Sequence, residues 1–108
     1  MSFPVLLTDD AASDLEDIYD YIVRHDAKGK ATRVLNRVEK AFKSLSENPR
    51  LGNYPKELLS IGIRDYRQVF FKPYRIIYRF MDNKVYVLLI VDGRRDMQAL
   101  LQKRLLMT

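Results

Sequence analysis

The chain has 108 residues, no cysteine and a formal net charge of +5 at pH 7. This length is typical of one domain spanning residues 1–108, and the lack of cysteine excludes a disulfide scaffold and fits a reducing compartment. The longest apolar runs fall far short of the ~20 residues that cross a bilayer. We therefore expect a cytoplasmic protein that makes no contact with a membrane.

The positive charge is concentrated in the second half of the chain. Residues 1–61 carry nine Lys or Arg and ten Asp or Glu, whereas residues 62–108 carry ten and four. Most of these basic residues are arginines placed among aromatic residues. This pattern favours a surface that binds a polyanion or an acidic protein over simple solubility.

The first half of the chain predicts a short strand and two helices. Residues 3–7 are an apolar strand candidate, and an amphipathic helix follows from Thr8 to about His25. A second apolar stripe covers residues 31–45 and ends before Asn48. Because the connection between the helices is short, they should pack antiparallel. The acidic side chains of the first helix are interpreted as its solvated face: Asp14, Glu16, Asp17 and Asp20.

The second half predicts a small sheet. Residues 49–62 contain two prolines and two glycines, which indicates a loop. Three β-rich runs follow at 63–71, 74–81 and 84–91, with connections short enough for hairpins. The last run is apolar at both parities, so we expect a central strand that is covered on both faces. Residues 96–106 have leucines at helical spacing and predict a short helix.

The predicted fold class is therefore α+β. It has an N-terminal strand, an antiparallel two-helix hairpin packed on a three- to four-stranded, mainly antiparallel sheet, and a short C-terminal helix.

Strand parity predicts where the arginines point. In the run 74–81, Tyr74 and Tyr78 share a face that should meet the helices, whereas Arg75 and Arg79 share the other face. We expect these two guanidiniums to project from the open side of the sheet, close to Arg64 or Arg67.

Three segments, in this order and spacing, resemble one known family. They are Gly62-Ile63-Arg64, Tyr74-Arg75-Ile76-Ile77-Tyr78-Arg79 and Asp92-Gly93-Arg94-Arg95-Asp96. The chain resembles the RelE/ParE superfamily of bacterial toxins from type II toxin–antitoxin pairs. The resemblance implies that a cognate antitoxin wraps the helix hairpin and the sheet, in a heterotetramer or a larger complex. The residues implied to contact the antitoxin are Leu15, Ile18, Tyr19, Ile22, Val38 and Phe42.

The superfamily divides by chemistry. RelE-like members are ribosome-dependent mRNA endoribonucleases, and ParE-like members inhibit DNA gyrase. RNA cleavage requires groups that accept and donate protons, and residues 96–108 contain neither the Tyr nor the His that ribonuclease members typically place there. The sequence is therefore closer to the ParE-like branch, a non-catalytic inhibitor of gyrase with no catalytic residue and no cofactor. Its target-binding residues would be Arg64, Arg67, Arg75, Arg79, Arg94, Arg95, Lys103 and Arg104.

Two alternatives stay open. One is a RelE-like endoribonuclease, whose partners are the ribosome and mRNA and whose arginines clamp message phosphates. The other is a non-toxic module that binds an antitoxin or a nucleic acid. A transition-metal site is not expected, because the chain has one histidine and no cysteine.

Overall fold

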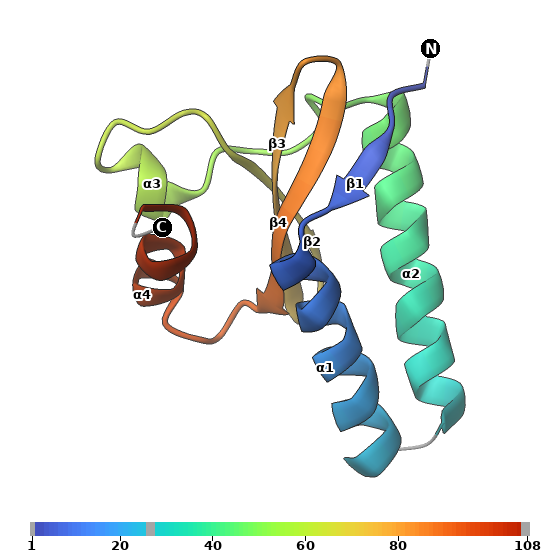
Figure 1. Cartoon of the computed structure of the whole chain (residues 1–108). Helices are drawn as coiled ribbons and strands as arrows, with labels where there is room; N and C mark the ends of the chain where they lie inside the picture. The colour runs from blue at the N-terminus through green and yellow to red at the C-terminus, as the bar shows by residue number, and fades with distance from the viewer. Residues whose placement is uncertain (1, 26–27, 107–108) are drawn as a thin grey trace.

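The computed structural model describes residues 2–25 and 28–106 (Figure 1). Strand β1 (Val5–Leu7) leads into the long helices α1 (Asp9–His25) and α2 (Lys28–Glu47), and the short helix α3 (Lys56–Leu59) follows. Strands β2 (Arg67–Phe71), β3 (Tyr74–Met81) and β4 (Lys84–Asp92) come next, and α4 (Met97–Leu101) continues into the π-helical turn η1 (Gln102–Leu106). The predicted α+β fold class is confirmed. None of the helices in the described ranges is long and apolar enough to span a membrane.

The four strands form one sheet in the order β1-β4-β3-β2. Strands β2, β3 and β4 are an antiparallel meander, whereas β1 pairs in parallel with β4. The turn between β3 and β4 places Asp82 and Asn83 at φ angles of 55° and 58°. Asp and Asn tolerate this left-handed conformation, and it suits a tight hairpin.

A β-bulge in β4 changes which of its buried side chains lie on each face of the sheet. Ile77 of β3 faces Leu89, but its neighbour Tyr78 faces Val87, so Leu88 is an extra residue in β4. The bulge shifts the alternation of side chains by one residue. Val87 and Ile90 therefore lie on the same face despite their odd spacing, and the prediction of a central strand covered on both sides is confirmed.

The sheet has an apolar cluster on each face. Figure 1 shows that α1 and α2 cover one face, and that α3 and α4 lie on the other. On one face, Val38 and Leu45 of α2 pack with Ile76 and Tyr78 of β3. The aromatic face of the middle strand therefore meets the long helices, as predicted. On the other face, α3 and α4 lie side by side and are joined by a second cluster. Its buried members are Leu58, Ile77, Leu89, Val91, Met97 and Leu101.

Two expectations about the segment before the sheet are wrong. The predicted loop 49–62 contains α3, and the strand predicted to begin at residue 63 begins at Arg67. The helix is only four residues long, and buried Leu58 provides its apolar contact with the sheet. Too few residues were available for a helical period to stand out.

Candidate functional site

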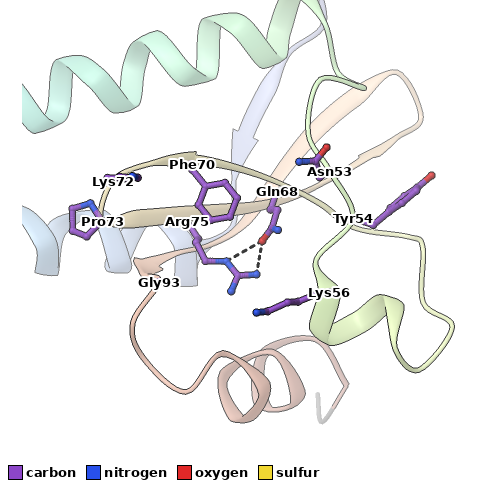
Figure 2. Close-up of a pocket in the computed structure, with 9 residues that line it drawn as sticks. All are labelled: Asn53, Tyr54, Lys56, Gln68, Phe70, Lys72, Pro73, Arg75 and Gly93. Atoms are coloured by element: carbon purple, nitrogen blue, oxygen red, sulfur yellow. Dashed lines mark hydrogen bonds between the residues drawn. The ribbon is translucent and has the colours of Figure 1, made fainter.

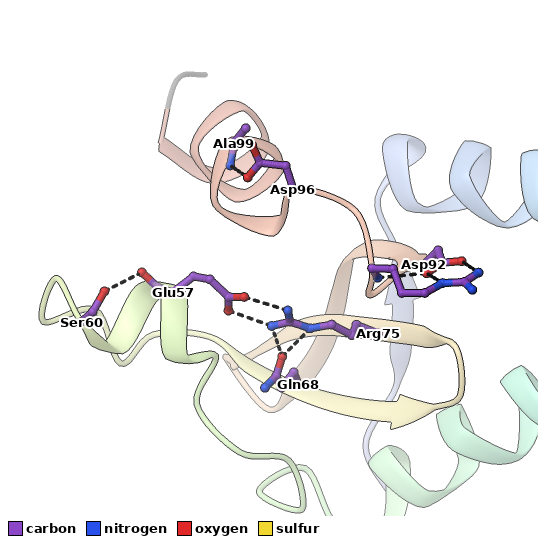
Figure 3. Close-up of polar contacts among 8 residues, drawn as sticks. Glu57, Ser60, Gln68, Arg75, Asp92, Asp96 and Ala99 are labelled. Atoms are coloured by element: carbon purple, nitrogen blue, oxygen red, sulfur yellow. Dashed lines mark hydrogen bonds and ion pairs between the residues drawn. The ribbon is translucent and has the colours of Figure 1, made fainter.

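Arg75 does not project from an open sheet. It is only 6% exposed, because α3 and α4 cover part of the face to which it points. Its Nη1 and Nη2 donate hydrogen bonds to the two carboxylate oxygens of Glu57 at 2.9 Å each, and its Nε donates to Oε1 of Gln68 at 2.9 Å (Figure 3). Arg75 Nη2 also donates to Gln68 Oε1. The expectation that this guanidinium faces solvent is therefore wrong.

The Arg75 contacts have a clear electrostatic consequence. The hydrogen bonds from Arg75 lower the pKa of Glu57, and burial of the carboxylate opposes this shift only in part. Glu57 is therefore ionised near neutral pH, and the pair is a charge-assisted bidentate contact between β3 and α3. The sequence did not predict this partner, since Glu57 was expected in a loop.

A pocket of about 530 Å³ lies beside Arg75 (Figure 2). Its lining is contributed by the loop before α3, by α3 itself, by β2, the β2–β3 turn and the start of β3, and by the turn after β4. The Arg75 guanidinium lies over the face of the Phe70 ring, with its Cζ 5.7 Å from the ring centroid. The lining residues are Asn53, Tyr54, Lys56, Gln68, Phe70, Lys72, Pro73, Arg75 and Gly93.

Arg94 and Arg95 lie on the surface where β4 ends, as predicted. The Arg94 side chain is 80% exposed, and its Nη2 lies 2.5 Å from Oδ2 of Asp92. Hydrogen bonds from Arg94 lower the pKa of Asp92, so this carboxylate stays ionised and keeps Arg94 close to the strand end. Arg95 is exposed.

The remaining predicted arginines of the sheet lie at its β2 edge. Arg79 is partly exposed and lies 3.7 Å from the carboxylate of Asp65, so its predicted projection into open solvent is only partly correct. Arg67 donates to the carbonyl of Gly52 at 2.9 Å and to the hydroxyl of Tyr54 at 3.2 Å. Arg64 is exposed.

The two basic residues of the tail differ in their surroundings. Lys103 is exposed. Arg104 instead binds both carboxylate oxygens of Asp14 in α1, at 2.6 and 3.1 Å. The interpretation of Asp14 as part of a solvated face is therefore wrong, since its side chain is 11% exposed.

Tyr78 lies on the face of the sheet that α1 and α2 cover, where its hydroxyl binds the segment after α2. Its hydroxyl donates to the carbonyl of Pro49 at 2.8 Å and accepts from the amide of Gly52 at 2.9 Å. Burial raises the pKa of this phenol, so it remains protonated and holds the segment that follows α2 against β3.

An apolar groove of about 370 Å³ lies between α1 and α2. Of the six residues expected to contact an antitoxin, Leu15 and Tyr19 line this groove. Ile18 and Phe42 are partly buried against the core. Ile22 and Val38 are 3% and 1% exposed, so their expected place on a contact surface is wrong. The lining residues are Leu7, Ala12, Leu15, Glu16, Tyr19, Thr32 and Leu35.

No group of three or more His, Cys, Asp or Glu side chains within residues 2–25 and 28–106 is arranged to hold a metal ion. His25 lies at the end of α1, where its Nδ1 is 3.0 Å from the carbonyl oxygen of Tyr21 and its ring stacks on the Tyr21 ring. Both contacts of His25 are with Tyr21, which lies one turn earlier in the same helix.

The family described as the ParE toxin of the type II toxin–antitoxin system parDE matches residues 5–97. Toxin ParE3 of Caulobacter vibrioides is 32% identical over 100 residues, which cover 93% of this chain and 96% of that protein.

Solved toxin structures share the fold. The chromosomal ParDE system of P. aeruginosa matches with a TM-score of 0.69 at 21% identity, covering 84% of this chain and 96% of that chain. The RelBE2 toxin–antitoxin complex of Mycobacterium tuberculosis matches with a TM-score of 0.59 at 25% identity, covering 85% and 99%. A mutant of the E. coli toxin RelE in the free state matches with a TM-score of 0.62 at 15% identity, covering 92% of each chain. With the family match over most of its length, the chain belongs to the ParE toxin family of type II toxin–antitoxin systems, within the RelE/ParE superfamily.

Proposed function

We propose that this protein is a non-catalytic toxin that inhibits DNA gyrase in the cytoplasm and that a cognate antitoxin neutralises it. The match of residues 5–97 to the ParE toxin family supports the gyrase branch. The ParDE and RelBE2 structures, which share this fold, support an antitoxin as the partner.

The observation that carries the proposal is the bonding of Arg75. If the pocket beside Arg75 were an RNA-cleaving site, this guanidinium would have to be free to stabilise charge on the phosphorane. Arg75 already makes four hydrogen bonds, two to Glu57 and two to Gln68. Binding a phosphate there would break a nearly buried ion pair and leave the Glu57 carboxylate without its partner, which is costly. Arg75 is better suited to hold α3 on the sheet than to bind substrate.

The exposed basic residues at this end of the sheet then form the surface that contacts the target. Arg94 and Arg95 lie together at the end of β4, and Lys103 is exposed on η1. Exposed basic side chains in the turn after a central strand suit electrostatic docking to an acidic protein or to the DNA that it holds.

A ribosome-dependent endoribonuclease remains the second candidate because of one observation. The Tyr54 hydroxyl lies 3.2 Å from Arg67 Nη2, and the Arg67 guanidinium lies over the Tyr54 ring, 4.6 Å from its centroid. A phenol next to a guanidinium can donate a proton in RNA cleavage.

An assay with purified gyrase tests the proposal. The toxin should inhibit supercoiling and accumulate cleaved DNA, and Arg94→Ala/Arg95→Ala should lose this activity. The control Arg33→Ala/Lys43→Ala removes the same charge from the exposed surface of α2 and should keep it.

Two results would contradict the proposal. If expression cuts mRNA at codons while gyrase is unaffected, and Tyr54→Phe abolishes the cleavage, the protein is an endoribonuclease. If expression without antitoxin neither slows growth nor cuts RNA, it is a non-toxic binding module.

A further inference from the structure

A second basic pocket, of about 360 Å³, lies at the β2 edge of the sheet, separate from the pocket next to Arg75. Its residues come from the segment after α2, the segment before β2, and strands β2 and β3. Four of them are arginines and one is an aspartate, which gives the pocket a formal charge of +3. The lining residues are Arg50, Arg64, Asp65, Arg67, Arg79 and Phe80.

Three of the four guanidiniums are held in place by contacts that leave their charge intact. Arg50 lies over the Phe80 ring at 5.3 Å, and Arg79 lies over the Tyr66 ring at 5.7 Å. Arg67 is fixed by its hydrogen bonds to the Gly52 carbonyl and the Tyr54 hydroxyl. Stacking and hydrogen bonding to neutral groups fix the guanidinium planes before any ligand arrives, which lowers the entropy cost of binding.

The pocket carries more positive than negative charge. Asp65 is its only lining carboxylate; its side chain is 57% exposed, and it approaches Arg79 no closer than 3.7 Å. Such an exposed pair neutralises little. Arg50 and Arg64 make no ion pair or hydrogen bond within the described parts of the chain. Like charges in one pocket repel each other, so a bound anion would relieve this repulsion.

We propose that this pocket binds the phosphodiester backbone of DNA. Four guanidiniums around one cavity suit successive phosphates better than a single carboxylate, because a DNA backbone brings one negative charge per nucleotide and each phosphate can accept bidentate hydrogen bonds from an Arg side chain. The volume also leaves room for the sugar next to the phosphate. This inference rests on the proposed function for the choice of DNA as the polyanion, and it places a phosphate-binding site away from Arg94 and Arg95.

The test measures binding of a short fluorescent DNA duplex to the toxin in the absence of gyrase, over a series of salt concentrations. Arg50→Ala/Arg64→Ala should weaken binding and reduce the slope of log K against log salt by about 1 for each phosphate that the variant no longer neutralises. Asp65→Asn should strengthen binding, because it removes the competing carboxylate. Circular dichroism verifies that each variant is folded.

The controls make the same charge changes elsewhere. Arg33→Ala/Lys43→Ala and Glu39→Gln change the charge of exposed α2 positions and should have much smaller effects. If each pocket variant changes the affinity for the duplex by no more than its control does, the affinity reflects the overall charge of the protein, and the proposal is overturned. It is also overturned if poly-glutamate or inorganic phosphate binds in an Arg50- and Arg64-dependent manner while the duplex does not. Because gyrase is absent from this assay, the two proposals can fail independently. A toxin that does not inhibit supercoiling could still bind the duplex, and a toxin that does not bind the duplex could still inhibit gyrase.

Discussion

Asp14 of α1 and Arg104 of η1 form an ion pair that covers the edge of β4 beyond the end of β1. The Ile90 amide donates to Asp14 Oδ2 at 3.0 Å, and Arg104 Nη1 donates to the Leu88 carbonyl at 3.1 Å. β1 pairs with β4 only as far as Val87. The two side chains therefore satisfy backbone groups that a longer β1 would have bonded, and they protect a strand edge that could otherwise pair with another chain.

We predict that Asp14→Ala destabilises the toxin. The change removes the acceptor of the Ile90 amide and the carboxylate that Arg104 binds at 2.6 Å, and leaving a buried donor unsatisfied costs about 1–3 kcal/mol. The free energy of unfolding in urea measures the effect. Asp20→Ala removes an exposed carboxylate from the same helix and should change stability little; equal effects of the two substitutions would show that the Asp14 hydrogen bonds contribute nothing.

Tyr78→Phe should also destabilise the fold. The hydroxyl bridges the Gly52 amide and the Pro49 carbonyl, so its removal leaves a buried donor unsatisfied at a cost of about 1–3 kcal/mol. The Gly52 backbone lies so close to β2 that it can carry no side chain, because a Cβ there would lie 2.5 Å from the Gln68 carbonyl oxygen. Tyr86→Phe is the matched control, since Tyr86 lies on the same sheet with a partly exposed side chain. An unchanged midpoint of thermal unfolding in Tyr78→Phe would contradict this role.

The Glu57–Arg75 pair should make stability depend on pH in the acid range. The pKa of Glu57 is lowered in the folded protein, from an ordinary value of 4.5, chiefly by the hydrogen bonds from Arg75. The folded state therefore holds this proton less tightly than the unfolded state. The contribution to stability is complete above 4.5 and is lost as the pH falls through the lowered pKa.

Glu57→Gln isolates this contribution. The variant should be less stable than the wild type at neutral pH, and the difference should shrink as the pH falls below 4.5. Urea unfolding at a series of pH values measures it. Asp92 also has a lowered pKa, but it is present in both proteins and cancels in the difference. A difference that stays constant with pH would show that Glu57 is not ionised in the pair.

The parts of the fold that the sequence predicted depend on local repeats. The apolar stripe of α2 and the alternation of Tyr74 to Phe80 each extend over enough residues to show their period. They placed the long helices on the correct face of β3. The bulge at Leu88 could not be predicted, because a run that is apolar at every position does not show which residues lie on which face of the sheet.

The candidate site was less predictable because its contacts join distant residues. Arg75 and Glu57 are 18 positions apart, and Asp14 and Arg104 are 90 apart. Parity gave the correct face for Arg75, but it could not show that α3 would cover this face, since a four-residue helix leaves no periodic signal. A carboxylate in an acidic helix likewise looks the same in sequence whether it is solvated or paired.

The final prediction concerns antitoxin binding at the apolar groove between α1 and α2. Leu35 lines the groove and is only partly buried, so Leu35→Glu places a charge there without removing a core side chain. The antitoxin that we propose would have to desolvate this carboxylate. Affinity should fall roughly tenfold or more, as is usual for a charge placed at the centre of an apolar interface. Calorimetric titration with the proposed cognate antitoxin measures the loss.

Leu51→Glu is the control for this substitution. Leu51 is 51% exposed and does not line the groove, so the same charge there should leave the affinity unchanged. In cells, the antitoxin should rescue growth with Leu51→Glu but not with Leu35→Glu. If both variants bind the antitoxin like the wild type, the groove is not its contact surface, and the interface must lie elsewhere on the helices or on the sheet.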